Sequence, residues 1–161
     1  MIMNATEKHD HDDLPEPAAE RREAMRLLAR ATGAELAAAW QAIADKPEVA
    51  AVRGPETGLV MVRGRIGGGG DPFNLGEATV TRATVRLSSG EIGHGQLLGT
   101  DKERARFAAI FDALYQNPAY RPAVEALHRQ IAARLLNEER RKAEETAATR
   151  VDFFTMVRGE D

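Results

Sequence analysis

Two arginines stand beside a run of glycines in the segment Arg63-Gly64-Arg65-Ile66-Gly67-Gly68-Gly69-Gly70. Glycine lets the backbone come close to an anion and direct N–H groups toward it, and arginines can add charge-assisted hydrogen bonds. Residues two apart point to the same face of an extended chain, so we expect Arg63 and Arg65 to leave the sheet together. The segment is not a Walker A loop, because no Lys-Ser or Lys-Thr follows the glycines. Three interpretations remain: a phosphate or phosphonate contact that includes Gly67 and Gly68, a contact with an acidic patch on a partner, or a solvated pair beside a connector.

A histidine between two glycines is the second candidate, in the segment Gly93-His94-Gly95-Gln96-Leu97-Leu98-Gly99. The flanking glycines leave His94 reachable by a ligand or a partner, although a structural histidine in a sheet is the more ordinary interpretation. The glycine spacing differs from the dinucleotide-binding fingerprint, so we expect no cofactor here.

Other groups that could do chemistry are isolated in the sequence. Glu56 and Glu77 lie in the same glycine-rich half and could serve acid–base chemistry, but nothing fixes their separation. His128 follows Leu127 of an apolar helical face and is expected to be an ordinary surface or interface residue. The run from His9 to Asp13 could hold a divalent metal, but a solvated acidic tail is the simpler interpretation, so no metal site is expected.

Helical periodicity surrounds these candidates on both sides. Apolar residues recur every three or four positions in four stretches. They are Ala24, Leu27, Leu28 and Ala31; Leu36, Trp40 and Ile43; Phe107, Ile110, Phe111 and Leu114; and Val124, Leu127, Ile131 and Leu135. Capping-box spacing at Thr32–Glu35 and again at Thr100–Glu103 predicts the start of the second and third helices. The first two stretches predict a helical hairpin.

The middle of the chain predicts strands. Twelve of the 14 glycines lie between Gly54 and Gly99, and helical periodicity stops there. The apolar run 59–62 predicts a buried strand, and residues 79–87 alternate with Ala83, Val85 and Leu87 on the apolar side. A turn at 88–90 leads into a strand over 91–98, and 67–76 is expected to be a loop. The fold class is therefore α+β: a small antiparallel β-sheet with a glycine-rich loop, flanked by an N-terminal helical hairpin and two C-terminal helices.

Three regions are expected along the chain. Residues 1–16 form a disordered acidic tail, 17–136 a single domain, and 137–161 a charged helical extension with an apolar tail that docks on a partner. The apolar face of the last helix adds surface that so small a domain is not expected to cover alone.

Composition excludes several functional classes. The 161 residues carry a net charge of −3, and Asp and Glu outnumber Lys and Arg by 25 to 22, so nucleic-acid binding is not expected. The sequence contains no cysteine, which excludes disulfides, thiolate metal sites and a cysteine nucleophile. No apolar run is long enough to span a membrane and no secretory signal is recognisable, so a cytoplasmic protein is expected. Leu, Ile, Val and Phe make up only about a fifth of the chain, which favours help from a partner.

The middle of the chain resembles the G subunit of the bacterial carbon–phosphorus (C–P) lyase system. The resemblance covers about residues 53–115 and lies in four segments. They are Pro55-Glu56-Thr57-Gly58-Leu59-Val60-Met61-Val62-Arg63-Gly64-Arg65-Ile66-Gly67-Gly68, then Pro72-Phe73-Asn74-Leu75-Gly76-Glu77 with Val80-Thr81-Arg82, then Gly93-His94-Gly95 with Leu98-Gly99, and finally Asp112-Ala113-Leu114. So long and unusual a motif string is specific.

The resemblance implies a subunit of an enzyme complex that is inactive alone. Members of this family work with subunits H, I and L to transfer a phosphonate to the ribose C1 of ATP with release of adenine, and subunit J later breaks the carbon–phosphorus bond. ATP and phosphonate would be substrates of the complex, and this chain alone would bind no cofactor. The alternative is a stand-alone phosphate- or phosphonate-binding protein without catalysis. The candidate substrate- or partner-binding residues are Arg63, Arg65, Gly67, Gly68, Glu77, Arg82 and His94.

Overall fold

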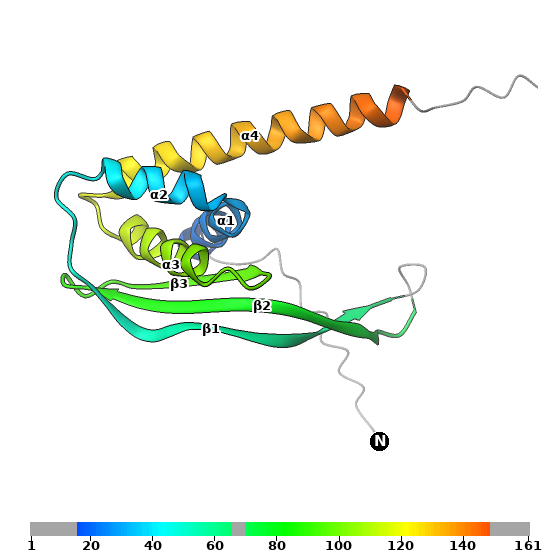
Figure 1. Cartoon of the computed structure of the whole chain (residues 1–161), viewed down its shortest axis with the longest axis horizontal. Coiled ribbons are helices and arrows are strands. Elements are labelled where there is room, and N and C mark those ends of the chain that lie inside the picture. The colour runs from blue at the N-terminus through cyan, green and yellow to red at the C-terminus, as the bar shows by residue number, and fades with distance from the viewer. Residues whose placement is uncertain (1–15, 66–69, 149–161) are drawn as a thin grey trace, which may run out of the picture.

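A computed structural model describes residues 16–65 and 70–148 of the chain. Four helices and three strands follow one another in the order α1 (Glu16–Arg30), α2 (Gly33–Ala42), β1 (Val49–Gly64), β2 (Phe73–Leu87), β3 (Ile92–Leu98), α3 (Lys102–Gln116) and α4 (Arg121–Ala148). The strands form one antiparallel sheet, and the helices are stacked over one of its faces (Figure 1). The α+β fold class predicted from the sequence is confirmed.

The sheet has the order β1-β2-β3, so β2 is its central strand. Alternation along β2 is as predicted: Ala83, Val85 and Leu87 are buried under the helices, whereas Arg82 and Arg86 are exposed on the opposite face. That opposite face, which no described element covers, is called the outer face below. The turn into β3 contains Gly90 with φ of +110°, a backbone conformation that glycine adopts without strain.

The β1–β2 pair continues well beyond the end of β3. β3 pairs only with residues 80–86 of β2, and β1 pairs with β2 as far as Gly64 and Phe73. Residues 59–64 and 73–79 therefore form a two-stranded ribbon, called the arm, which projects past α1, α2 and α3 in Figure 1. The expected glycine-rich loop is shorter than predicted, because residues 73–76 already belong to β2.

Strand 59–62 exists as predicted, but the prediction that it is buried is wrong. Leu59, Val60, Met61 and Val62 are all exposed. The reason is that β3 is only seven residues long and α3 runs back over it, so nothing in the described chain reaches the arm.

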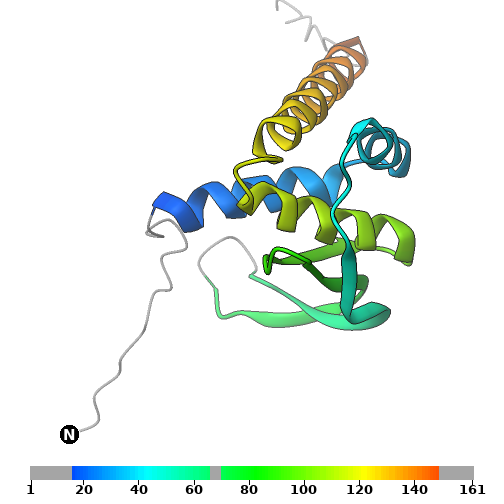
Figure 2. The same ribbon diagram turned by 90° about the vertical axis from the view of Figure 1, so that its left-hand side faces the viewer.

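The helices pack through the apolar faces that the sequence predicts. Leu28, Leu36, Phe111 and Ile131 are fully buried in one core cluster. α1 and α2 are joined by two residues but are set at a steep angle, so that each lies against α3 and α4 rather than along the other (Figures 1 and 2).

Helix starts differ in how well the sequence places them. The Thr32–Glu35 capping box is present, with Thr32 N–H donating to Glu35 and Glu35 N–H donating to Thr32 Oγ1. α3 instead begins one residue later than its predicted box: Asp101 is the N-cap and accepts a hydrogen bond from the Arg104 N–H at 2.9 Å. Aspartate is a strong N-cap, so it takes the position from Thr100.

The apolar seam of α4 is covered within the chain. Val124, Leu127, Ile131 and Leu135 are all buried against the other helices, so this face does not need a partner. The helix continues to Ala148, and the side chains described from 139 to 147 are exposed. The apolar tail expected to dock on a partner, and the acidic tail up to residue 15, lie outside the described residues.

His128 is buried, which differs from its expected surface position. Its ring lies 5.4 Å from that of Tyr115, and its Nε2 has no hydrogen-bond partner among the described residues. Burial lowers the pKa of His128, against the opposing influence of Glu125 and Glu23. His128 is buried because its position on α4, next to Leu127, turns the ring toward Tyr115 of α3.

This burial predicts a contribution to the pH dependence of stability. Near pH 6 the unfolded chain binds a proton at His128 more readily than the folded chain, so acidification through about 6.5 favours unfolding. In His128→Leu, the fall in unfolding free energy between pH 7.5 and pH 5.5 should be smaller than in the wild type. Urea denaturation at several pH values measures this; identical slopes would mean that His128 titrates alike in both states.

Candidate functional site

The predicted site residues fall at two separate places. Arg63, Arg65 and Glu77 lie on or next to the arm, whereas Arg82 and His94 lie on the outer face of the sheet. Gly67 and Gly68 lie outside the described residues. The chain therefore does not gather these candidates into one pocket.

Glu56 is held between two arginines on the outer face. Its Oε1 accepts from Nε of Arg82 at 2.6 Å and from Nε of Arg53 at 2.8 Å. The hydrogen bond from Arg82, helped by the charge of Arg53, lowers the pKa of Glu56, so this side chain is a carboxylate rather than a general acid. The charge of Arg82 is in turn directed at Glu56.

Glu56 and Glu77 do not form an acid–base pair. Glu56 pairs across the sheet with Arg82, and Glu77 pairs with Met61. Five positions along β2 separate Arg82 from Glu77, which corresponds to about 17 Å. That distance is too long for two groups acting on the same atom of a small substrate.

A small cavity of about 270 Å³ opens beside this cluster, where the pairing of β1 with β2 is irregular. Glu56, Thr57, Gly58 and Arg82 are among the residues that line it. Thr57 is tied to the buried Thr81 through their hydroxyls at 2.9 Å. The cavity offers a carboxylate already paired with arginine, so its polar groups are largely satisfied from within the chain.

His94 lies in the next row of the outer face. Its Nδ1 is 3.2 Å from Thr84 Oγ1, and its side chain is exposed. The backbone N–H of His94 donates to the buried carboxylate of Asp112 at 2.8 Å. The side chain is thus reachable, while the strand that carries it is fixed from behind.

Asp112 is the buried polar residue that sequence reasoning missed. It is 0% exposed and accepts from Arg21 Nε at 3.0 Å and Arg21 Nη2 at 2.7 Å, besides the His94 N–H. Asp112 therefore ties α1 and the edge strand β3 to α3. The available signal was an acidic residue inside the apolar run 107–114.

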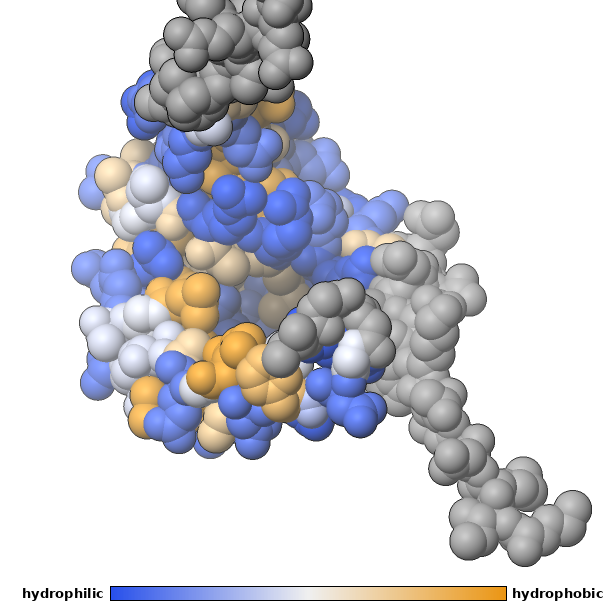
Figure 3. Space-filling view, turned by 90° about the vertical axis from the view of Figure 1, so that its right-hand side faces the viewer, coloured by the Kyte–Doolittle hydropathy of each residue, from blue (hydrophilic) through white to orange (hydrophobic). Residues whose placement is uncertain are grey.

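The far end of the arm carries the two arginines singled out first. Arg63 pairs with Asn74 just beyond an irregularity in the β1–β2 register, and Arg65 follows the end of β1. Both side chains are exposed, but strand alternation stops at Gly64 and so does not extend to Arg65. Figure 3 views the molecule from the side on which the arm projects and shows hydrophobic residues gathered there.

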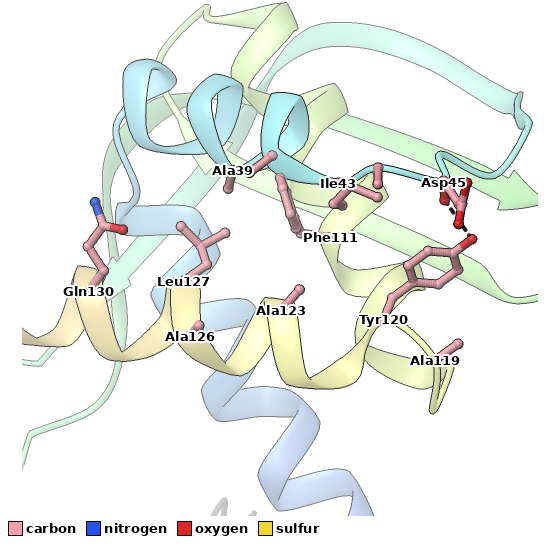
Figure 4. Close-up of a pocket in the computed structure, with 12 residues that line it drawn as sticks. Ala39, Ile43, Asp45, Phe111, Ala119, Tyr120, Ala123, Ala126, Leu127 and Gln130 are labelled. Atoms are coloured by element: carbon pink, nitrogen blue, oxygen red, sulfur yellow. Dashed lines mark hydrogen bonds between the residues drawn. The ribbon is translucent and has the colours of Figure 1, made fainter.

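A second, apolar hollow of about 500 Å³ lies between α2 and α4 (Figure 4). Its walls are rich in alanine, and Phe111 and Leu127 point into it. At one end the hydroxyl of Tyr120 donates to the carbonyl of Asp45 at 2.9 Å. Most of the lining suits an apolar group, and its polar side chains, Asp45, Tyr120 and Gln130, are few.

Residues 16–65 and 70–148 form neither a metal-binding cluster nor a membrane-spanning helix. This part of the chain brings together no group of three His, Asp or Glu side chains suited to a metal, and the His9–Asp13 run lies outside it. None of the helices described has the length and apolar character needed to cross a membrane.

Comparison with known proteins identifies a matching family and a similar relative. The sequence model of the family described as "Phosphonate metabolism protein PhnG" matches residues 19–159. A protein of Rhizobium meliloti (strain 1021), described as "Alpha-D-ribose 1-methylphosphonate 5-triphosphate synthase subunit PhnG", is 82% identical over 143 residues, covering 89% of this chain and 92% of that relative.

Proposed function

Because this chain belongs to the family of phosphonate metabolism protein PhnG, we propose that it is a subunit of an alpha-D-ribose 1-methylphosphonate 5-triphosphate synthase. The observation that carries the proposal is the 82% identity to a relative described as such a subunit. The family is the one indicated by the resemblance of residues 53–115. The proposal is therefore supported by a motif string and by similarity along most of the chain.

We propose further that the complete enzyme contains subunits H, I and L and acts with subunit J. A phosphonate oxygen would bond to C1 of the ribose of ATP as the bond from C1 to adenine breaks, and adenine would leave. ATP and phosphonate are then substrates of the complex, and we propose that it works in the cytoplasm.

The share of this chain in that reaction is assembly and shaping of the site rather than proton transfer. Glu56 is already paired with two arginines, and Glu77 lies about 17 Å along the sheet from that pair. The pairing of Glu56 and its separation from Glu77 are consistent with a structural role for this chain in the complex. The second candidate function, a stand-alone phosphate- or phosphonate-binding protein, is favoured only by the two exposed arginines at the end of the arm.

Co-purification separates these two functions. A tagged copy of this chain should bring down the other synthase subunits from cells growing on a phosphonate. Recovery of the chain alone, under conditions in which those subunits are present and folded, would contradict the subunit role and favour the stand-alone protein.

Replacing Arg63 and Arg65 by alanine tests whether the end of the arm binds an anion. Charge-assisted contacts contribute about 1.5–3 kcal/mol each, so a binding role predicts about a tenfold or larger effect per residue. If the arginines bind substrate, the complex should assemble normally and its transfer reaction should slow, mainly at low substrate. If they face a partner, assembly itself should fail.

The matched control is Arg140→Ala, which removes an exposed arginine from α4. It should leave both assembly and transfer unchanged, because exposed positions away from contacts contribute little. Unchanged assembly and activity in the Arg63/Arg65 double variant as well would leave only a solvated pair.

A further inference from the structure

The arm exposes large apolar side chains on both of its faces. Alternation along β1 places Leu59 and Met61 on one face, exposed by 63% and 52%, and Val60 and Val62 on the other, exposed by 40% and 38%. Phe73 and Leu75, exposed by 41% and 62%, extend this surface toward the end of the arm. Six of the ten exposed large apolar residues of the described chain lie here.

Such a ribbon is not expected to be stable by itself in water. Isolated two-stranded ribbons are marginal, and three strands or a packed layer are normally needed. Before residue 80, β2 has no neighbour other than β1, and β1 is an edge strand along its whole length. Exposed apolar surface together with open strand edges marks an interaction site.

We propose that the arm is inserted into a cleft with two apolar walls on a different subunit of the synthase. The inference rests on the proposed function, since it requires a hetero-oligomer. A flat partner surface would cover one face and leave the other in water, so the occupant must contact both. A strand of the partner can also pair with the main chain of the arm, because the outer edge of β1 offers N–H and C=O groups that no other strand of the sheet pairs with.

A second copy of this chain fits the arm less well. Edge-to-edge pairing of two β1 strands would satisfy the backbone but leave both apolar faces wet. The apolar hollow between α2 and α4 holds about 500 Å³ and has walls from those two helices with Phe111 at its base. It can take a few side chains but cannot enclose a ribbon from both sides.

The test places one charge on each face of the arm in the full chain. Leu59→Glu, opposite Thr79 on the face shared with Met61, and Val62→Glu are made in the tagged chain and co-expressed with the other synthase subunits. Both positions are exposed, so the unfolding midpoint of the chain should be unchanged. Each variant should retain at least about tenfold less of the partner subunits than the wild type, because a charge is buried without a counterion in either wall.

The matched control is Val52→Glu, on the same strand but outside the arm and exposed by 56%. It should retain the partners as the wild type does. Loss of the partner subunits with only one of the two arm variants would mean that the partner contacts a single face of the arm, which would overturn the two-walled cleft. Retention with both would overturn docking by the arm altogether.

Two other outcomes separate the remaining possibilities. If the wild-type chain purified alone forms a dimer that both arm variants abolish while partner retention is unchanged, the occupant is a second copy and the proposal is wrong. If the wild type itself retains no partner subunit, the proposed function fails and the inference falls with it. Partner retention by the wild type and by both variants rejects the inference alone.

Discussion

Asp112→Ala is expected to lower the free energy of unfolding by about 2–4 kcal/mol, somewhat less than the cost of breaking a fully buried ion pair, because the Arg21 side chain is 35% exposed. The carboxylate is fully buried and accepts three hydrogen bonds, two from Arg21 and one from the backbone N–H of His94. Alanine would leave the Arg21 guanidinium without its counterion and the edge of β3 without an acceptor. The substitution therefore weakens α1, β3 and α3 together.

Chemical denaturation of the full chain, followed by circular dichroism, measures this loss. The matched control is Glu23→Ala, which removes a carboxylate that pairs with Arg26 at 2.7 Å but is exposed to solvent. Exposed pairs contribute about 0–1 kcal/mol, so this variant should unfold close to the wild type. A loss of less than about 1 kcal/mol in Asp112→Ala would show that water replaces the carboxylate at this site.

The local parts of the fold are predictable from the sequence because their signals are local. Alternation from 79 to 87 places Ala83, Val85 and Leu87 correctly under the helices, and the Thr32–Glu35 box starts α2 where expected. Each of these signals involves residues within one element or one turn. Periodicity alone also identifies the buried face of α4.

The exposure of strand 59–62 is different, because a continuous apolar run looks the same whether it is buried or belongs to a two-sided arm. The outcome depends on the relative lengths of three strands: β3 has seven residues and β2 has 15. No residue within 59–62 carries that information. What covers a strand is a property of its neighbours, which the run itself does not encode.

The contacts of the candidate site could not be predicted from the sequence for a similar reason. The contact of Arg82 with Glu56 joins residues 26 positions apart and depends on a register that contains two irregularities between Ala51 and Glu56. The contact of Asp112 with Arg21 spans 91 positions. Residue type suggested that arginines and His94 mattered, but only the folded chain shows which of them are already partnered.

Gly95→Ala is expected to destabilise the chain by about 3 kcal/mol or more, at the upper end of what overpacking causes. A Cβ at this position would lie 2.1 Å from the carbonyl oxygen of Ala105 and 2.7 Å from the backbone nitrogen of Ala109. Both contacts are to the α3 backbone, which cannot rotate away as a side chain would. The helix would have to move off the sheet, and with it the core residues Ile110 and Phe111.

Gly58→Ala is the control, because nothing lies within 4 Å of a Cβ built there. This variant, also in a strand, should be neutral or slightly stabilised, since alanine restricts the unfolded chain. Denaturation of both variants gives the comparison, and equal stabilities would rule out the close contact between β3 and α3. The glycines beside His94 suggested from the sequence that a ligand can reach it. The contact of Gly95 with α3 assigns them a different role: strand β3 carries no side chain there because the helix backbone occupies the space.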